Sequence, residues 1–215
     1  EQQGTLDVND IKLDRGLSAF DATHRLTANF LYELPFLRKA SGPAGLFGGW
    51  QVGGILSLQS GFPFTVVTSE DYNLDGAFTD RPNGASSIPS QVGDGPHAFL
   101  NGAFGERSSW ASLFVPAAPG ANGTLGRNTF RGPGYAAFDL SLLKAFRAPW
   151  FTSEGSHWEF RAEFFNLFNR VNLRAPSASL GAFAPATRLW SNVNFGRSLS
   201  SFDARQIQLA IKFVF

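Results

Sequence analysis

The stretch from Asp71 to Gly76 has the residue types and spacing best suited to hold a metal ion. It reads D-x-N-x-D-G, which matches the first half of a calcium-binding loop. In such loops, side-chain oxygens at alternate positions converge on the ion and the Gly permits a sharp turn. The predicted ligands are Asp71, Asn73 and Asp75, with Asp80 close enough along the chain to contribute. Ca²⁺ is therefore a possible cofactor, and no other cofactor is indicated.

The second half of this loop departs from the calcium pattern. Pro82 stands where a calcium loop ends with a bidentate Glu. The competing interpretation is a polar loop rich in turns that Asp and Asn side chains form with their own backbone. Both interpretations stay open from the sequence.

No other pattern in the sequence points to catalysis. The three His residues are scattered without metal-ligand spacing, and neither a G-x-S-x-G elbow nor a phosphate-binding loop occurs. Glu159 and Glu163 lie on one face of a predicted strand with Arg161 between them, which is typical of charges that line a polar lumen. We therefore expect that the protein is not an enzyme, with an acid–base carboxylate pair as the weaker interpretation.

The composition fits a surface that faces lipid. Phe occurs 23 times, while charged residues make up only 16% of the chain, against roughly 25% in soluble domains. Lys and Arg (18) nearly balance Asp and Glu (17), so nucleic acid is not expected as a partner. The longest uncharged run, Ala40 to Ser69, contains too many Gly and Pro residues for a membrane-spanning helix.

Alternation of apolar and polar residues predicts five long strands. In the first, Leu26, Ala28 and Phe30 alternate with Arg25, Thr27 and Asn29. Ile55 breaks the alternation by facing the polar side of the second strand. Strands of a β-sandwich average only about 5–6 residues, about half the predicted lengths, so membrane-spanning strands are favoured. The predicted strands are residues 23–34, 49–60, 136–147, 157–168 and 204–215.

The connections between these strands alternate in length. Residues 35–48 and 148–156 are short connections, whereas 61–135 and 170–203 are long. Outer-membrane barrels have short periplasmic turns and long extracellular loops, so with a periplasmic C-terminus the long connections are extracellular. The loop 61–135 holds Phe99, Phe104, Trp110 and Phe114, and we expect it to pack on itself and over the barrel mouth. It either captures ligand or serves as a structural lid.

Five strands are too few to close a barrel, since single-chain bacterial barrels have at least about 8. An open sheet in lipid would leave the N–H and C=O groups of its edges unpaired. The chain also lacks Met. We therefore expect further strands upstream, so that this chain is the C-terminal part of a larger protein.

Several segments resemble a known family. These are LGRNTFRGPGY (125–135) followed by FDLSL (138–142), FRAEFFNLFN (160–169), FGR (195–197) and ARQIQL (204–209). They look like the late barrel of TonB-dependent receptors, in particular the Oar-like receptors with a carboxypeptidase-regulatory-like domain. The resemblance implies a 22-stranded barrel with a plugged lumen, of which this chain supplies the last five strands. It also implies uptake of an unknown substrate, energised by a TonB complex that contacts an N-terminal part absent here.

The end of the chain resembles the signal that the barrel-assembly machinery reads. Leu209, Ile211, Phe213 and Phe215 recur at alternate positions up to the C-terminus. They are equally expected as the lipid-facing residues of the last strand, and the two roles are compatible.

The sequence thus predicts an all-β antiparallel transmembrane barrel segment in the bacterial outer membrane. Its expected partners are membrane lipid, the assembly machinery, the TonB complex and the substrate. A secreted all-β module that binds calcium or another ligand, or acts in adhesion, is the alternative from another class. A passive porin is a third possibility.

Overall fold

The computed structural model describes residues 5–35, 48–84, 114–147 and 156–215. The chain divides into two compact units that interleave along the sequence. The first, here called the sheet unit, comprises His24–Gln59, Tyr135–Val171 and Asp203–Phe215. The second, the loop unit, comprises Glu1–Thr23, Ser60–Gly134 and Asn172–Phe202. Within the described ranges, no helix has the length and apolar character needed to cross a membrane.

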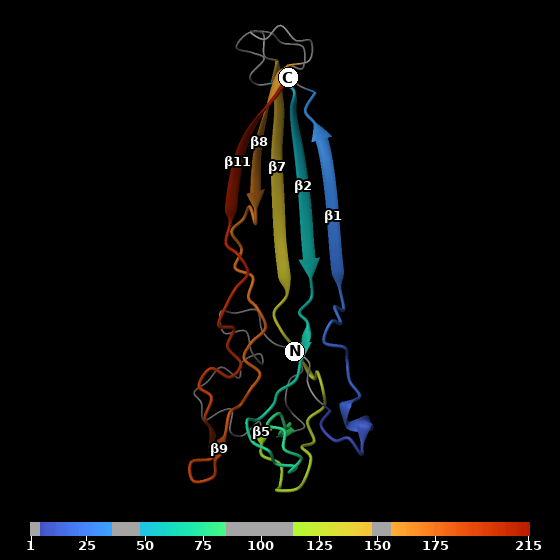
Figure 1. The fold of residues 1–215 in the computed structure, drawn as a ribbon, viewed down its shortest axis with the longest axis vertical. Helices are drawn as coiled ribbons and strands as arrows, with labels where there is room; N and C mark the ends of the chain where they lie inside the picture. Colours follow the sequence, from blue (N-terminus) through green and yellow to red (C-terminus); the bar gives the residue numbers. More distant parts are fainter. Residues whose placement is uncertain (1–4, 36–47, 85–113, 148–155) are drawn as a thin grey trace. The chain divides into compact units, whose positions relative to one another are not determined.

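The sheet unit is one antiparallel sheet of five strands in the order β1-β2-β7-β8-β11 (Figure 1). Each long strand pairs with the next long strand along the chain, so the sheet is an up-and-down meander. The all-β antiparallel fold expected from the sequence is therefore confirmed. The strands are β1 (Arg25–Glu33), β2 (Trp50–Gln59), β7 (Tyr135–Arg147), β8 (His157–Phe165) and β11 (Gln206–Val214).

The strand bounds lie close to the predicted ranges, with the largest difference at the end of β8. This strand stops at Phe165, whereas the alternation extended to residue 168. Asn166 takes a left-handed backbone conformation with φ of 50°, and its backbone N–H donates to the Asp139 carboxylate at 2.8 Å. Asn tolerates this conformation, and it turns the chain out of the sheet. The apparent alternation at Phe168 therefore belongs to a turn.

The register separates the sheet into two chemically different faces. Directly paired residues share a face, because side chains alternate along each strand. On one face Leu26 pairs with Leu58, Phe30 with Gly54, Leu56 with Phe138, Leu140 with Phe164, and Ala162 with Leu209. The other face carries Arg25, Glu33, Asp139, Glu159, Arg161, Glu163 and Lys212, together with Leu31 and Ile55. We call these the apolar face and the polar face.

The loop unit has its own hydrophobic core. Its short elements are the 3₁₀ helix η1 (Ile11–Asp14) and the strand pairs β3 (Pro63–Phe64) with β6 (Phe130–Arg131), β4 (Asn83–Gly84) with β5 (Phe114–Val115), and β9 (Phe183–Ala184) with β10 (Leu189–Trp190). The core comprises Phe64, Val66, Phe114, Leu125, Phe130, Leu180, Trp190 and Phe195.

The sequence predicts that the loop 61–135 packs on itself, but its core also includes residues from another segment. Leu180, Trp190 and Phe195 come from the other long connection, so the two connections share one core. The backbone joins them as well, since the N–H of Val67 donates to the carbonyl of Ala178 at 3.0 Å. Phe114 is fully buried as part of this core. The other aromatic residues expected in the packing, Phe99, Phe104 and Trp110, lie outside the described residues.

Candidate functional site

The Asp71 loop brings three of the predicted ligands into a single tight turn. Both carboxylate oxygens of Asp71 accept backbone N–H groups, from Asp75 at 3.1 Å and from Gly76 at 2.9 Å. The Asn73 side-chain oxygen accepts the same Asp75 N–H at 3.1 Å, and Asp75 accepts the N–H of Ala77 at 2.7 Å. Gly76 has φ of 88°, a conformation that Gly adopts without steric cost. The residues therefore form successive Asx turns.

Asp80 lies beneath this turn and is only 3% exposed. One of its carboxylate oxygens accepts the backbone N–H groups of Tyr72 at 2.6 Å and Asn73 at 2.9 Å. Burial raises the pKa of Asp80 because it removes water from the charged form; the two N–H donors oppose this shift, and the nearby charges of Asp75 and Asp71 add to it. Asp80 thus holds the loop in place from its buried side through these two hydrogen bonds.

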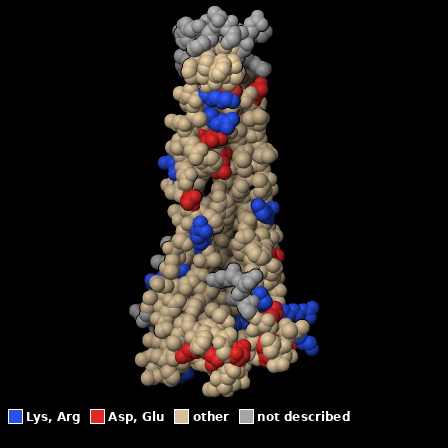
Figure 2. Space-filling view, in the orientation of Figure 1, with Lys and Arg blue, Asp and Glu red and all other residues tan. Residues whose placement is uncertain are grey.

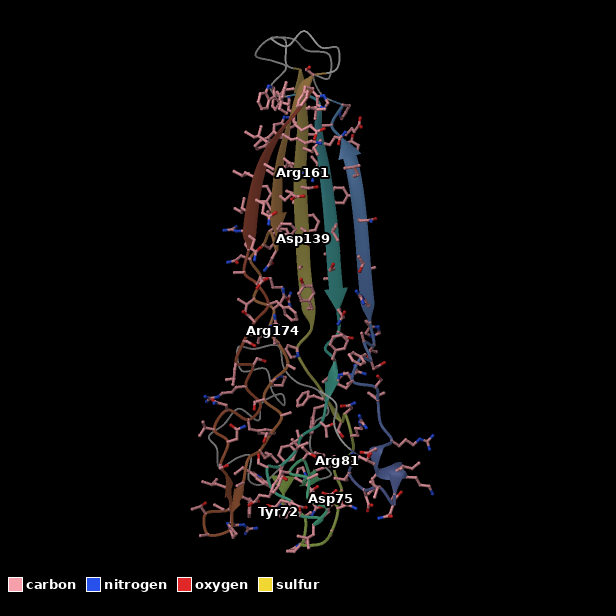
Figure 3. The ribbon with its side chains drawn as sticks, viewed as in Figure 1. Tyr72, Asp75, Arg81, Asp139, Arg161 and Arg174 are labelled. Atoms are coloured by element: carbon pink, nitrogen blue, oxygen red, sulfur yellow. The ribbon has the colours of Figure 1, made fainter. Side chains whose placement is uncertain are left out.

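The surroundings of the loop tie it to other segments of the loop unit. The Asn73 side-chain NH₂ donates to the carbonyl of Leu6 at 2.8 Å and to the side-chain oxygen of Asn122 at 3.1 Å. The hydroxyl of Tyr72 donates to Glu70, and burial followed by this contact raises the pKa of Tyr72. Figure 3 shows Tyr72, Asp75 and Arg81 in this region. The loop is therefore held in place by neutral and charged hydrogen bonds.

The Asp71 loop is shaped by hydrogen bonds from its own backbone to its side chains. Across the described ranges, no group of three or more His, Cys, Asp or Glu side chains is placed so as to hold a metal ion. The Asx-turn interpretation fits the geometry directly. Calcium binding by Asp71, Asn73, Asp75 and Asp80 stays a prediction.

We expect Asp80→Asn to stabilise the loop unit at neutral pH in calcium-free buffer. The Asn side-chain oxygen keeps both accepted hydrogen bonds, while the buried charge facing Asp71 and Asp75 is removed. Because folding raises the pKa of Asp80, the wild-type loop unit gains stability as pH falls through that pKa, and the variant lacks this gain. Thermal unfolding of the intact protein with a chelator, at neutral and mildly acidic pH, measures both effects.

If the loop binds calcium, Asp80→Asn is expected to be less stable than the wild type when calcium is present. If the ion holds the loop, millimolar calcium stabilises the wild-type protein and Asp80→Asn loses that stabilisation. A wild-type protein that shows no calcium effect in unfolding or calorimetry would end the calcium prediction.

The polar face of the sheet carries charges of alternating sign. Glu159 pairs with Lys212 across the strands, and Arg161 lies 3.9 Å from Glu163 along β8. Both side chains of the latter pair are partly exposed, so the ion pair contributes little to stability. Figure 2 shows acidic and basic groups along the visible side of the molecule, and Figure 3 places Arg161 and Asp139 on the strands. The arrangement is a solvated polar wall rather than an isolated carboxylate pair.

The apolar face exposes large side chains that a soluble domain would bury. Leu209 is 68% exposed and Ile211 is 70% exposed in β11. The ring of Phe138 stacks on Phe30 at 6.4 Å and on Phe168 at 5.8 Å between centroids. A continuous apolar surface of this kind marks contact with lipid or protein.

Aromatic rings gather at the end of the apolar face where the C-terminus lies. Phe146 pairs with Trp158, and Trp158 pairs with Phe213 at 4.6 Å between ring centroids. Trp50 contacts Phe160 edge-on at 6.0 Å. Aromatic residues with this placement are typical of the interface between hydrocarbon and water.

Lys144 is a charged residue whose position was not among the predictions from the sequence. It lies on the apolar face of the sheet, opposite Trp50, and is 2% exposed. Its ammonium donates to the carbonyl of Gly48 and lies 5.3 Å from the ring centroid of Trp50 and 5.0 Å from that of Phe146. The alternation through Leu140 and Leu142 in the sequence already indicates that residue 144 lies on the apolar face. The aromatic rings and the carbonyl satisfy a cation that would otherwise be costly on this face.

Comparison with known families decides what this exposed apolar sheet belongs to. The model of a family described as an outer membrane beta barrel domain matches residues 1–208. The chain belongs to this outer-membrane β-barrel family. Its location is the bacterial outer membrane. Searches of the curated proteins and of the solved structures each gave no match.

Membership in the barrel family assigns the two faces of the sheet. Strands of outer-membrane barrels alternate apolar residues toward lipid with polar residues toward the interior. The apolar face is therefore the lipid-facing surface of this barrel domain. Leu209, Ile211 and Phe213 lie on it, and Phe215 follows β11 with 93% exposure. Their reading by the assembly machinery stays a prediction.

Proposed function

We propose that this barrel domain is the C-terminal part of a TonB-dependent receptor in which external loops capture a substrate for energised uptake. The outer-membrane localisation favours this interpretation over a secreted module. The resemblance of residues 125–142 and 160–169 to the late barrel of these receptors supports the finer assignment. The proposal gives the chain a transport role and no catalytic one.

The open sheet is the observation that carries the proposal of a larger barrel. In the described part of the chain, β1 and β11 each pair along one side only. Unpaired N–H and C=O groups in hydrocarbon cost several kcal/mol each, so both edges need further strands. A 22-stranded barrel with a plugged lumen, as in outer-membrane transporters, supplies these strands. The edge of β11 is also where we expect the assembly machinery to act.

The loop unit supports the proposal that the long connections form a capture surface. A connection that only joined two strands would need no core, yet these connections bury Phe114, Phe130 and Phe195 completely. Some apolar residues nevertheless stay exposed in this unit, with Leu74 at 71% and Phe78 at 66%. Exposed apolar side chains on a well-packed loop are a common basis for recognition.

We expect the intact gene product to bind the periplasmic C-terminal domain of TonB. The intact protein, purified in detergent, is titrated with that domain by calorimetry, and a variant lacking the segment upstream of the barrel is the control. Saturable binding that the control loses agrees with the proposal. An intact protein without such binding, and with uptake of solutes that does not depend on TonB, would instead be a passive porin.

A further inference from the structure

The connection between β8 and β11 is strongly basic. All of its residues are described, and its charged side chains are five Arg and a single acid, Asp203. Arg174, Arg188 and Arg197 belong to the loop unit. Arg170 and Arg205 belong to the sheet unit, at the end where β8 leaves the sheet and β11 enters it. These two arginines therefore lie at the rim of the barrel wall.

Two Asn side chains fix the backbone around Arg170 and Arg205. The Asn166 side chain accepts the N–H of Arg170 at 3.0 Å and donates to the carbonyls of Arg170 at 2.9 Å and Asp203 at 3.4 Å. The Asn169 side chain accepts the N–H of Arg205 at 3.0 Å. Both Asn residues have left-handed backbones, with φ of 50° and 51°. These hydrogen bonds hold the backbones of the two arginines near each other. We call this end of the sheet unit, with Phe168, Arg170, Val171 and Arg205, the corner.

The guanidinium groups of this corner are exposed. Both Arg170 and Arg205 are exposed, and the described residues give neither side chain an ion pair or a side-chain hydrogen bond. A guanidinium offers a planar set of donors that matches the oxygens of a phosphate. Two carboxylates lie near these groups: Asp203 is exposed, and Asp139 is partly buried and accepts the Asn166 backbone N–H at 2.8 Å, so the two guanidinium groups are the exposed donors that the corner offers to an anion.

Apolar side chains lie directly beside these charges. Phe168 is 74% exposed, and its ring stacks on Phe138, whose side chain is on the lipid-facing surface. Val171 is 71% exposed. Cations next to apolar groups at the end of a lipid-facing surface match the boundary between hydrocarbon and headgroups.

We propose that the corner formed by Phe168, Arg170, Val171 and Arg205 binds a phosphate-bearing lipid headgroup. Phe168 and Val171 contact the acyl region, while the two guanidinium groups bind phosphate oxygens. The inference rests on the proposed function only for the assignment of this rim to the outer surface of the cell.

The test measures lipid binding by the intact protein in neutral detergent micelles. The probe is lipid A with its two phosphates, and the comparison lipid is lipid A from which the phosphates have been removed. We expect Arg170→Gln/Arg205→Gln to lower the affinity for the phosphorylated lipid about 30-fold, since each Arg near a charged surface contributes roughly 1 kcal/mol. The matched control, Arg188→Gln/Arg197→Gln, removes two exposed arginines of the same connection outside the corner and should stay within about twofold of wild type.

Three results would overturn this inference. The first is an equal loss of affinity in the control variant. The second is equal binding of the phosphorylated and dephosphorylated lipids by the wild type. The third is competition by inorganic phosphate at concentrations comparable to the lipid, which would indicate a small-anion site. The charge-retaining variant Arg170→Lys/Arg205→Lys should bind more tightly than the Gln variant and less tightly than wild type, because Lys keeps the charge and lacks the planar donor set, and this separates loss of charge from loss of fold. TonB binding by the same preparations tests the proposed function separately, because headgroup binding in micelles does not require it.

Discussion

Replacing Phe30 by Arg is expected to destabilise the membrane-inserted protein strongly, whereas Leu31→Arg should be tolerated. Both side chains are large, apolar and at least 50% exposed in β1. They lie on opposite faces, since Phe30 pairs with Gly54 and Leu31 with Gly53. An Arg on the lipid face near the bilayer midplane costs about 2–4 kcal/mol, while an Arg on the polar face remains solvated.

The Phe30 ring also covers the backbone of Gly54, together with the ring of Phe138. A Cβ added at Gly54 would lie 2.4 Å from the Phe30 ring, so the ring packs directly over the Gly backbone. Losing this cover adds to the cost of the charge. Urea unfolding of the intact protein in lipid vesicles measures both variants. Equal destabilisation by the two substitutions would contradict the assignment of the faces.

Replacing Phe114 by Ala is expected to loosen the loop unit and leave the sheet unit unchanged. The Phe114 ring is fully buried, with centroids 6.0 Å from Phe130 and 5.5 Å from Phe195. Truncating a buried Phe to Ala costs about 3–5 kcal/mol, because it removes apolar contacts and leaves a cavity. Hydrogen exchange of the intact protein, followed by peptide, reports on the two units separately.

The neighbouring Val115→Ala provides the control for this substitution. Val115 is in the same two-residue strand but is 48% exposed, so its truncation should change stability by less than about 0.5 kcal/mol. If Phe114→Ala lowered the protection of β7 and β8 as much as that of the loop unit, the division into two units would be wrong.

The sheet was predictable from the sequence because each of its strands encodes its environment locally. A lipid-facing strand must alternate over its whole length. Leu26, Ala28 and Phe30 therefore predict both the strand β1 and which of its two faces is apolar. The same alternation places Lys144 on the apolar face with Leu140 and Leu142, although its charge alone suggests the polar face. The alternation failed at Phe168, where the Asn166 backbone ends β8.

The loop unit was not predictable in the same way. Its strands have two residues each, which is too short for any periodicity, and its core joins residues as distant as Phe64 and Phe195. Such pairings depend on packing between segments far apart in sequence. The Asp71 pattern predicted a sharp polar loop, and the turn is present. The ion does not follow from the pattern, because the same side chains can accept backbone N–H groups.

The central claim, that the two faces of the sheet meet lipid and a polar interior, has a direct spectroscopic test. Single Cys residues are introduced in turn from 28 to 32 into intact protein without other Cys residues, and each carries a nitroxide label; the 215 residues of this chain contain no Cys of their own. The intact protein is placed in bilayers, and access of the label to oxygen and to a water-soluble nickel chelate is measured. The structure predicts a period of two, with oxygen access highest at 28, 30 and 32 and chelate access highest at 29 and 31. Access that does not alternate, or that alternates in the opposite phase, would contradict it.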